Sequence, residues 1–345
     1  MMNHKNFPEM PASFDRRVRN TLEALPDQPQ RARRFPFRRV ACIGLAAALC
    51  VGGTAFAASD LPQQIGRHFQ LLLHGSDEAL LSDYTITPAP GALSDENDDY
   101  RVTVESVLFD ESAGAGVVSL HIEDKKKTGV RPFGISETLE QYKGDNIVWS
   151  NLAECMGNED GQLVFDIWYG DKLDWCAGRF YLDTARSTEN DYYVEGAFIP
   201  VGDYTAADGP LRLEVGEQGA YLEEGGLTRL KPVLSVPLPE PRQMPYYRTS
   251  DGRVTLSQIG LRVNGPDMGC VVDDLDYIAV KMKDGSVLEI VDEENKIERT
   301  LYALGQESGV SGEGYDVGTY VLAKTFDLQN VRSVILNGDE YPLSE

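Results

Sequence analysis

Few residues of this chain have the types and spacing that catalysis or metal binding requires. The four histidines are His4, His68, His74 and His121, and His68 and His74 lie six residues apart, so a helix would place them on different faces. No HExxH, GxSxG or GxxxxGK[ST] motif is present to hold zinc, expose a serine or bind phosphates. The sequence therefore predicts no catalytic residue, no metal site and no cofactor, and we expect a protein that is not an enzyme.

One acidic run begins like a calcium-binding loop. Asp95, Asn97 and Asp99 place oxygen ligands at alternate positions. The loop then has Tyr100 at the sixth position, where glycine makes the sharp turn, and Ser106 at the twelfth, where a bidentate glutamate binds the ion. We therefore expect a solvated acidic loop that precedes a strand.

The cysteines allow two interpretations. Cys42 and Cys50 lie in an apolar segment, which leaves Cys155, Cys176 and Cys270, and three cysteines cannot all pair within one chain. In an oxidising compartment Cys155 and Cys176 could form a disulfide, and unpaired cysteines fit the spacing equally well.

A short amphipathic helix is predicted near the N-terminus. Its apolar face consists of Phe14, Val18, Leu22 and Leu25, spaced by four, four and three residues, and Pro26 ends the helix. A helix of about three turns is marginal in isolation, so this one would be stabilised by docking on a partner or on a membrane surface. The alternative is a solvated leader that only supplies positive charge.

Residues 40–58 carry no charge and predict a transmembrane helix. At ~1.5 Å per residue, a helix of this length reaches roughly 28 Å, close to the ~30 Å hydrocarbon core of a bilayer. Residues 1–39 carry nine basic and four acidic side chains, a balance of +5, so the positive-inside rule places the N-terminus in the cytoplasm. A cleaved signal peptide ending at Ala55-Phe56-Ala57 is the main alternative, and a buried core helix is the third.

The remaining residues, 59–345, form an acidic body with 23 basic and 51 acidic side chains, a balance of −28. Such a charge repels nucleic acid, so nucleic-acid binding is not expected. Residues 59–83 predict a juxtamembrane helical segment, with apolar positions at Ile65, Phe69, Leu72 and Leu73.

From Tyr100 onward the apolar residues alternate, and short strands separated by Gly-rich and Asp-rich turns follow one another to the C-terminus. We expect a first extracytoplasmic β module over 84–236, a stiff Pro-rich linker over 237–245 and a second β module over 246–345. The strands of the second module are predicted at 254–263, 276–292 with a hairpin turn at Asp284-Gly285, 318–327 and 331–343. Similar openings at 101–104 (RVTV) and 253–256 (RVTL) suggest a tandem repeat. The predicted fold is mainly β, with two tandem immunoglobulin-like β-sandwich modules behind a single N-terminal transmembrane helix.

Three segments carry a resemblance to a known family: FPEMPASFDRRVRNTLEALP, YRVTVESVLFDESAGAGVVSLHIED and TFDLQNVRSVILNGDEYPL. Together they resemble single-pass membrane proteins of Gram-positive bacteria built on domain of unknown function 4179, which are regarded as negative regulators of extracytoplasmic-function sigma factors. The resemblance implies that Phe14, Val18, Leu22 and Leu25 bind a sigma factor, and it supplies no catalytic residue. The chain departs from the zinc-binding anti-sigma domains because no cysteine precedes the apolar segment.

The sequence thus predicts a membrane-anchored, anti-sigma-factor-like regulator in the cell membrane, with a cytoplasmic N-terminus, an extracytoplasmic C-terminal region and an unidentified extracytoplasmic ligand. The alternative is a surface-anchored β-sandwich protein that binds or scaffolds envelope material without sigma regulation.

Overall fold

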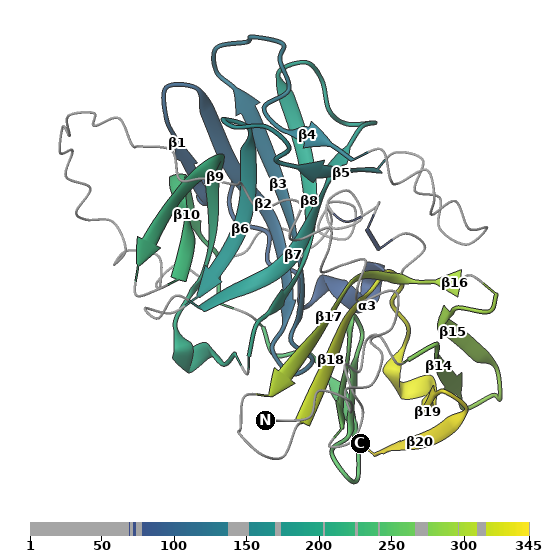
Figure 1. Cartoon of the computed structure of the whole chain (residues 1–345). Coiled ribbons are helices and arrows are strands. Elements are labelled where there is room, and N and C mark those ends of the chain that lie inside the picture. The colour runs from purple at the N-terminus through teal and green to yellow at the C-terminus, as the bar shows by residue number, and fades with distance from the viewer. Residues whose placement is uncertain are drawn as a thin grey trace, which may run out of the picture. The chain divides into compact units, whose positions relative to one another are not determined.

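A computed structural model describes residues 69, 72–73, 78–136, 152–169, 174–202, 204–224, 227–240, 242–265, 275–295, 297–308 and 315–344. The chain divides after Phe56 into two compact units, and every described residue lies in the second, Ala57–Glu345. This unit is mainly β and contains two large sheets, each with its own core, so the expected mainly β, sandwich-like fold is confirmed (Figure 1). The predicted N-terminal helix and the predicted span over 40–58 lie outside the described residues.

The first sheet is ten-stranded and antiparallel throughout. Its main path is β1 (Ser94–Glu96), β2 (Tyr100–Asp110), β3 (Ala115–Asp124), β8 (Asp191–Pro200), β7 (Asp174–Asp183), β6 (Leu163–Tyr169), β9 (Leu211–Glu224) and β10 (Leu227–Pro237). Off this path, β5 (Leu152–Met156) pairs with β7 and with β4 (Gly134–Ile135). The sheet curls until its last strand meets its first. Ser235 N in β10 donates a hydrogen bond of 2.9 Å to the Asp95 carboxylate in β1.

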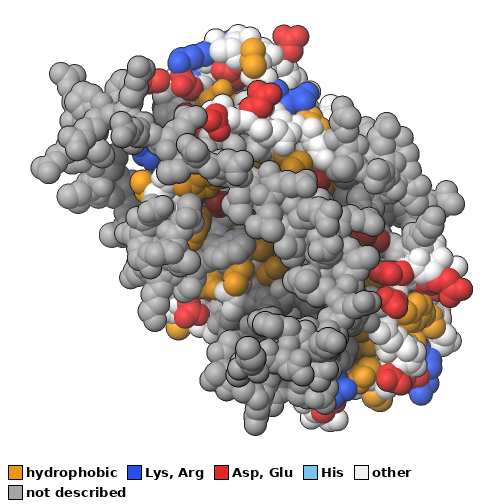
Figure 2. Space-filling model, in the orientation of Figure 1, with side chains coloured by type: hydrophobic (Ala, Val, Ile, Leu, Met, Phe, Trp, Pro, Cys, Tyr) orange, Lys and Arg blue, Asp and Glu red, His pale blue; other side chains and the backbone are white. Residues whose placement is uncertain are grey.

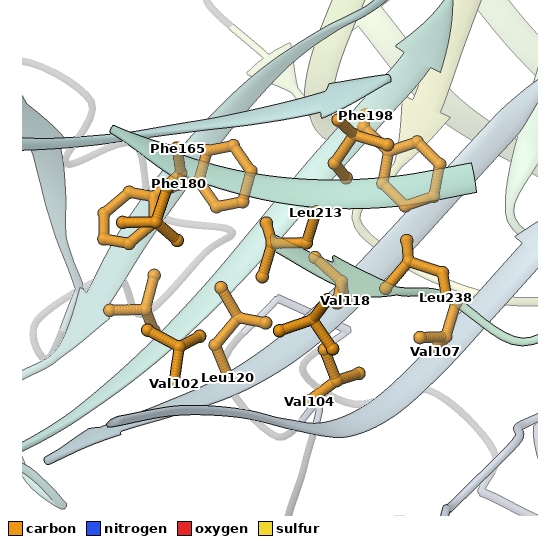
Figure 3. Close-up of a cluster of buried hydrophobic side chains, with 14 of the residues drawn as sticks. Val102, Val104, Val107, Val118, Leu120, Phe165, Phe180, Phe198, Leu213 and Leu238 are labelled. Atoms are coloured by element: carbon orange, nitrogen blue, oxygen red, sulfur yellow. The ribbon is translucent and has the colours of Figure 1, made fainter. Parts of the chain in front are cut away.

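Alternation of side chains along these strands produces the first core. Figure 3 shows side chains of β2, β3, β6, β7, β8 and β9 converging there, among them Val104, Leu120 and Phe198. The Phe198 ring stacks on Phe109 with a centroid distance of 5.4 Å. Burying each such side chain stabilises the fold by roughly 1.5–3 kcal/mol, so this core can hold the module together.

The second sheet is also ten-stranded and antiparallel. Its order is β16 (Ile297–Glu298), β15 (Val287–Asp292), β14 (Tyr277–Met282), β19 (Val331–Leu336), β20 (Asp339–Ser344), β11 (Tyr246–Thr249), β12 (Val254–Ser257), β13 (Gly260–Gly265), β18 (Tyr315–Leu322) and β17 (Thr300–Ser308). Strand β20 joins the two halves, because it pairs with β19 and, at its end, with β11. Residues of both halves, such as Leu261 and Val334, meet in one core.

The two sheets share part of their strand order. The path β1-β2-β3-β8-β7 in the first corresponds to β11-β12-β13-β18-β17 in the second. The similar RVTV and RVTL segments fall at matching places, since Val104 pairs with Leu120 and Leu256 pairs with Leu261. This correspondence favours the tandem repeat that the sequence suggested.

One detail of the second module differs from the sequence-based expectation and another agrees with it. The run at 254–263 was expected as one strand, but it is divided into β12 and β13. The reason is a local turn in which Ser257 Oγ accepts hydrogen bonds from Ile259 N and Gly260 N, at 3.3 and 2.9 Å. The turn predicted at Asp284-Gly285 is confirmed, and Gly285 has the positive φ of 89° that such a turn needs.

The segment predicted as a stiff Pro-rich linker is packed against the protein at both ends. Pro237 is the last residue of β10, and Leu238 lies in the first core with its N–H bonded to Leu211 O at 2.8 Å. Met244 is buried near the second module. The chain therefore passes from one sheet to the next while anchored by these two side chains.

Within the predicted juxtamembrane helical segment, the described helix is α3 (Glu78–Ser82). Before it, Leu73 N donates a hydrogen bond of 2.9 Å to Phe69 O, the spacing of one helical turn. Short 3-10 turns, η2 (Ala206–Asp208) and η3 (Leu328–Asn330), complete the elements.

Candidate functional site

The outward face of the first sheet carries a second buried cluster. Along β8, Tyr192, Val194 and Phe198 point into the first core, so the alternate residues face outward. The outward Ala197 and Ile199 are buried all the same, because other parts of the chain cover them. We call this the inter-module cluster; its buried members are Phe69, Leu72, Leu73, Leu81, Leu108, Ala115, Val117, Leu152, Tyr181, Ala197, Ile199, Met244, Ile259, Leu301, Val321 and Ala323.

The inter-module cluster joins three parts of the chain. The first sheet contributes Val117 and Ile199, the second module contributes Ile259 and Val321, and the segment before the first sheet contributes Phe69, Leu72, Leu73 and Leu81. Figure 1 shows α3, which carries Leu81, between the end of the first sheet and strands β17 and β18. The residues that follow the predicted span are therefore anchored where the two modules meet.

The β2–β3 hairpin of the first module contacts the β12–β13 hairpin of the second in this region. Asp110, at the end of β2, is fully buried and accepts hydrogen bonds from Ser112 N at 2.9 Å and Ala113 N at 3.3 Å. Burial raises the pKa of Asp110 to about 6, and a hydrogen bond from the Ser257 side chain partly opposes the rise. This contact links the two modules through a buried ionisable group.

Close packing continues beside Asp110. A Cβ added to Gly260 would lie 2.7 Å from the Cβ atoms of both Ala113 and Ala115, nearer than two carbon atoms can approach. Further along the contact, the Tyr181 hydroxyl donates a hydrogen bond of 3.0 Å to Leu301 O, and the Arg179 guanidinium lies 5.7 Å from the centre of the Tyr302 ring. The modules thus meet through close backbone packing, a hydrogen bond and a cation–π contact.

Glu195 is the most unusual residue of this face. Its side chain projects outward from β8, yet the residue is only 1% exposed. One oxygen, Oε2, accepts a hydrogen bond from Leu72 N at 3.3 Å, and Oε1 has no hydrogen-bond partner in the described part of the chain. Burial raises the pKa of the Glu195 carboxyl well above its ordinary value, and the negative charges of Asp183 and Glu105 act in the same direction.

Arg186 lies at the centre of the charged groups around Glu195. Its guanidinium donates to Glu105 Oε2 at 3.2 Å and lies 3.9 Å from Asp183 Oδ2. The same guanidinium lies over the Tyr193 ring, 4.0 Å from the ring centre. Arg186 is thus one positive charge shared among Asp183, Glu105 and Glu195, and it only partly opposes the rise in the pKa of Glu195.

A row of polar side chains extends this face away from the inter-module cluster. The rings of His121 and Tyr193, which are paired across β3 and β8, stack with a centroid distance of 4.7 Å. His121 Nε2 lies 3.0 Å from Asp191 Oδ1. On the face drawn in Figure 2, acidic and basic side chains are interspersed on the described surface.

No family model, no curated protein and no solved structure matches the chain. The resemblance to sigma-factor regulators therefore stays a prediction. Over the ranges that the structure describes, no helix is both long enough and apolar enough to cross a membrane.

The residues predicted to bind a partner, Phe14, Val18, Leu22 and Leu25, lie outside the described residues, as does the predicted span. The disulfide that the sequence allowed is not formed, and Cys155 and Cys176 are free thiols. Strand β5 carries Cys155, and its pairing with β7 ends at Glu154 opposite Tyr181. Tyr181 is five residues along β7 from Cys176, which is roughly 16 Å in a strand, whereas a disulfide needs Cα atoms within about 7 Å.

The acidic loop at 95–99 is built as a turn with paired charges. Asn97 Oδ1 accepts hydrogen bonds from Asp99 N and Tyr100 N, both at 2.8 Å. Lys126 pairs with Asp99, and Lys125 Nζ lies 3.5 Å from Glu96 Oε1. Among the described residues, no group of three or more His, Cys, Asp and Glu side chains is arranged to hold a metal ion.

Sequence reasoning missed Glu195, Asp183 and Arg186. One signal was available: Glu195 stands between Val194 and Gly196-Ala197 in an otherwise apolar strand end, on the same face as Ala197 and Ile199. A carboxylate among buried positions indicates a special environment. Its contacts could not be found from sequence, because Leu72 lies 123 residues away along the chain.

Proposed function

We propose that this protein is a membrane-anchored regulator, anti-sigma-factor-like, in which the β modules outside the membrane control a cytoplasmic helix. The observation that carries the proposal is the burial of Phe69, Leu72 and Leu73 in the inter-module cluster. These residues follow the predicted span, 40–58, by only 11 to 15 positions. A change in how the two modules meet would therefore act directly on the chain that leaves the membrane.

In this proposal the cytoplasmic helix, with Phe14, Val18, Leu22 and Leu25 on its apolar face, binds an extracytoplasmic-function sigma factor. A single membrane helix transmits a conformational change poorly unless it pairs with another helix or is cut. Regulated proteolysis is accordingly the coupling we propose, with release of the juxtamembrane residues exposing the chain to cleavage. The relationship of the modules to immunoglobulin-like sandwiches belongs to the same proposal, and the strand order shared by the two sheets supports a tandem repeat of one sandwich type.

The first experiment is a pull-down from detergent-solubilised membranes with the full-length protein and with a version that lacks residues 1–30. Bound proteins are identified by mass spectrometry. We expect a sigma factor with the full-length protein and none with the shortened version. Absence of any cytoplasmic partner from an intact, membrane-inserted full-length protein would contradict the regulator.

A matched pair of variants then tests the helix. Leu22→Asp places a charge on the predicted apolar face and should abolish recovery of the sigma factor. Asn20→Asp places the same charge on the opposite face of the same predicted helix and should leave recovery unchanged. Equal recovery with both variants would remove the helix from the proposal.

One observation favours the second candidate, a surface-anchored protein that binds envelope material. On β9 the aromatic and aliphatic side chains of Tyr221 and Leu222 are 47% and 43% exposed. Exposed aromatic residues on a strand are common in binding surfaces. If the pull-down recovers no sigma factor and Tyr221→Ala reduces retention of envelope fragments, this second function is the better account.

A further inference from the structure

We propose that Leu72 and Glu195 form a proton-operated latch, in which the juxtamembrane residues are held on the first sheet while the Glu195 carboxyl is neutral and are released when it ionises. The regulatory meaning of the latch rests on the proposed function. The latch itself is a property of contacts within Ala57–Glu345 and can be tested separately.

The first step of the argument is the position of Glu195. The residue points out of the sheet rather than into the first core, because its neighbours Val194 and Phe198 fill that core. An outward-facing carboxylate is ordinarily hydrated and charged. Glu195 is buried because Leu72 and the rest of the inter-module cluster lie over its face of the sheet. Removal of Leu72 would therefore return water to the carboxyl.

The second step is the pairing of the buried carboxyl. Within the described part of the chain, Glu195 Oε2 accepts a hydrogen bond from Leu72 N at 3.3 Å, and Glu195 Oε1 accepts none. Burying an ionised carboxylate with one free oxygen costs far more than burying a neutral carboxyl. The docked form therefore favours the neutral acid, whereas the released form favours the carboxylate. Docking takes up one proton, and release returns it to water.

The third step concerns the other charged groups that face Glu195. Strand β2 contributes Glu105, β7 contributes Asp183, and the turn after β7 contributes Arg186. Arg186 is hydrogen-bonded to Glu105 and lies near Asp183, so its single positive charge is shared by two carboxylates and the three groups keep a net charge of −1. The hydroxyl of Tyr181, which pairs with Glu195 across the strands, is already bonded to Leu301 O. None of them supplies a counter-charge reserved for Glu195.

The sign of the pH dependence follows from linkage. The pKa of Glu195 is raised in the docked form, so docking is fully favoured below the ordinary glutamate pKa of about 4.3. It weakens about tenfold per pH unit as the pH rises from there to the raised pKa, and it is constant above that pH. Alkaline conditions, or removal of the proton by any other route, would release Phe69, Leu72 and Leu73.

The test is hydrogen exchange followed by mass spectrometry on the full-length protein in detergent, from pH 5 to pH 9, with rates corrected for the intrinsic pH dependence of exchange. The readout is the protection of the peptide that contains the Leu72 and Leu73 amides. For the wild type we expect protection to fall at least tenfold across this range. Constant protection would overturn the latch.

Two variants make the result specific to Glu195. Glu195→Gln is permanently neutral and keeps an oxygen that can accept the Leu72 N–H, so its protection should stay high and independent of pH. His121→Gln removes the histidine of the polar row on the same sheet and should keep the wild-type response. A Glu195→Gln protein with the wild-type pH dependence would also overturn the latch. Because the readout is the Leu72 peptide, the latch can hold or fail whether or not a sigma factor binds.

Discussion

The β2–β3 hairpin of the first module and the β12–β13 hairpin of the second occupy the same place in the shared strand order, but they differ in length. Their antiparallel pairing matches residue for residue as far as the pairs Val104 with Leu120 and Leu256 with Leu261. The second hairpin then turns at once. The first continues to Asp110 before its chain returns at Ala115.

This difference explains how two similar modules become one unit. The extra part of the first hairpin supplies Leu108, Ala115 and Val117 to the inter-module cluster, and the short turn of the second supplies Ile259. Gly260 in the same turn packs closely against Ala115. The shared part of each hairpin faces its own core instead, at Leu120 and Leu261. The shared part of the hairpins thus packs in each module's own core. The extension adds Val107, Phe109 and Val118 to the first core and, on its other face, makes the contact between the modules.

The largest expected effect tests the shared part. Leu120 and Leu261 are both fully buried and hold matching positions, so Leu120→Ala and Leu261→Ala should each lower the free energy of unfolding by about 2–5 kcal/mol. Chemical denaturation followed by far-ultraviolet circular dichroism measures the loss, because both modules contribute strands to that signal whereas all three tryptophans lie in the first module. We expect one transition in both variants, because the inter-module cluster couples the modules.

Two separate transitions, one of them unchanged in each variant, would show that the modules unfold independently and would break the comparison. Val287→Ala is the control, because Val287 is an exposed strand residue of the second module and its truncation should change stability by less than about 0.5 kcal/mol.

The next effect tests the tip of the long hairpin. The pKa of Asp110 is raised to about 6 by burial, from an ordinary 3.8, so the folded protein binds this proton more tightly than the unfolded chain. The stability it confers is complete below pH 3.8 and is lost as the pH rises to about 6, a difference of roughly 3 kcal/mol. Asp110→Asn should flatten this part of the pH profile.

The measurement is the midpoint of urea unfolding between pH 4 and pH 7. Asp339→Asn is the control, because Asp339 is exposed, and it should keep the wild-type profile. An Asp110→Asn profile that still falls by as much as the wild type would show that other carboxyls govern stability in this pH range.

The sequence predicted the strands better than their arrangement. Alternation at Val102, Val104 and Leu120 is a local signal, so the strands of the first hairpin and the Asp284-Gly285 turn were found. The division of the second hairpin was missed, because it depends on one hydroxyl, Ser257 Oγ, that bonds two nearby N–H groups. No strand was predicted over Thr300–Ser308, which forms β17.

The inter-module cluster could not be predicted from the sequence, because its contacts are long-range. Its members come from segments separated by more than a hundred residues, as with Leu72 and Ile199. No periodicity records such contacts. The prolines at 237 and 239 predicted a stiff linker, but they gave no sign that Leu238 and Met244 within it are buried.

A smaller effect tests the contact between the two hairpin turns. Gly260→Ala would place a Cβ 2.7 Å from those of Ala113 and Ala115, and such overpacking should destabilise the contact by about 1–3 kcal/mol. Adding Ala115→Gly in the same chain opens space and should recover part of the loss. Differential scanning calorimetry measures both, and an additive double variant would show that the two turns do not touch in solution.

The smallest effect concerns one hydrogen bond between the modules. Leu301 is skipped in the pairing of β17 with β18, which shifts register between Thr300 and Tyr302, and its carbonyl accepts the Tyr181 hydroxyl at 3.0 Å. Tyr181→Phe keeps the ring and removes this bond, so we expect a loss of about 1 kcal/mol. Tyr246→Phe, at a tyrosine that is 38% exposed, is the control and should cost little. If this hydrogen bond stabilises the register shift in β17, Tyr181→Phe should also speed hydrogen exchange at residues 300–302. Unchanged exchange there would show that the shift does not depend on the bond to Tyr181.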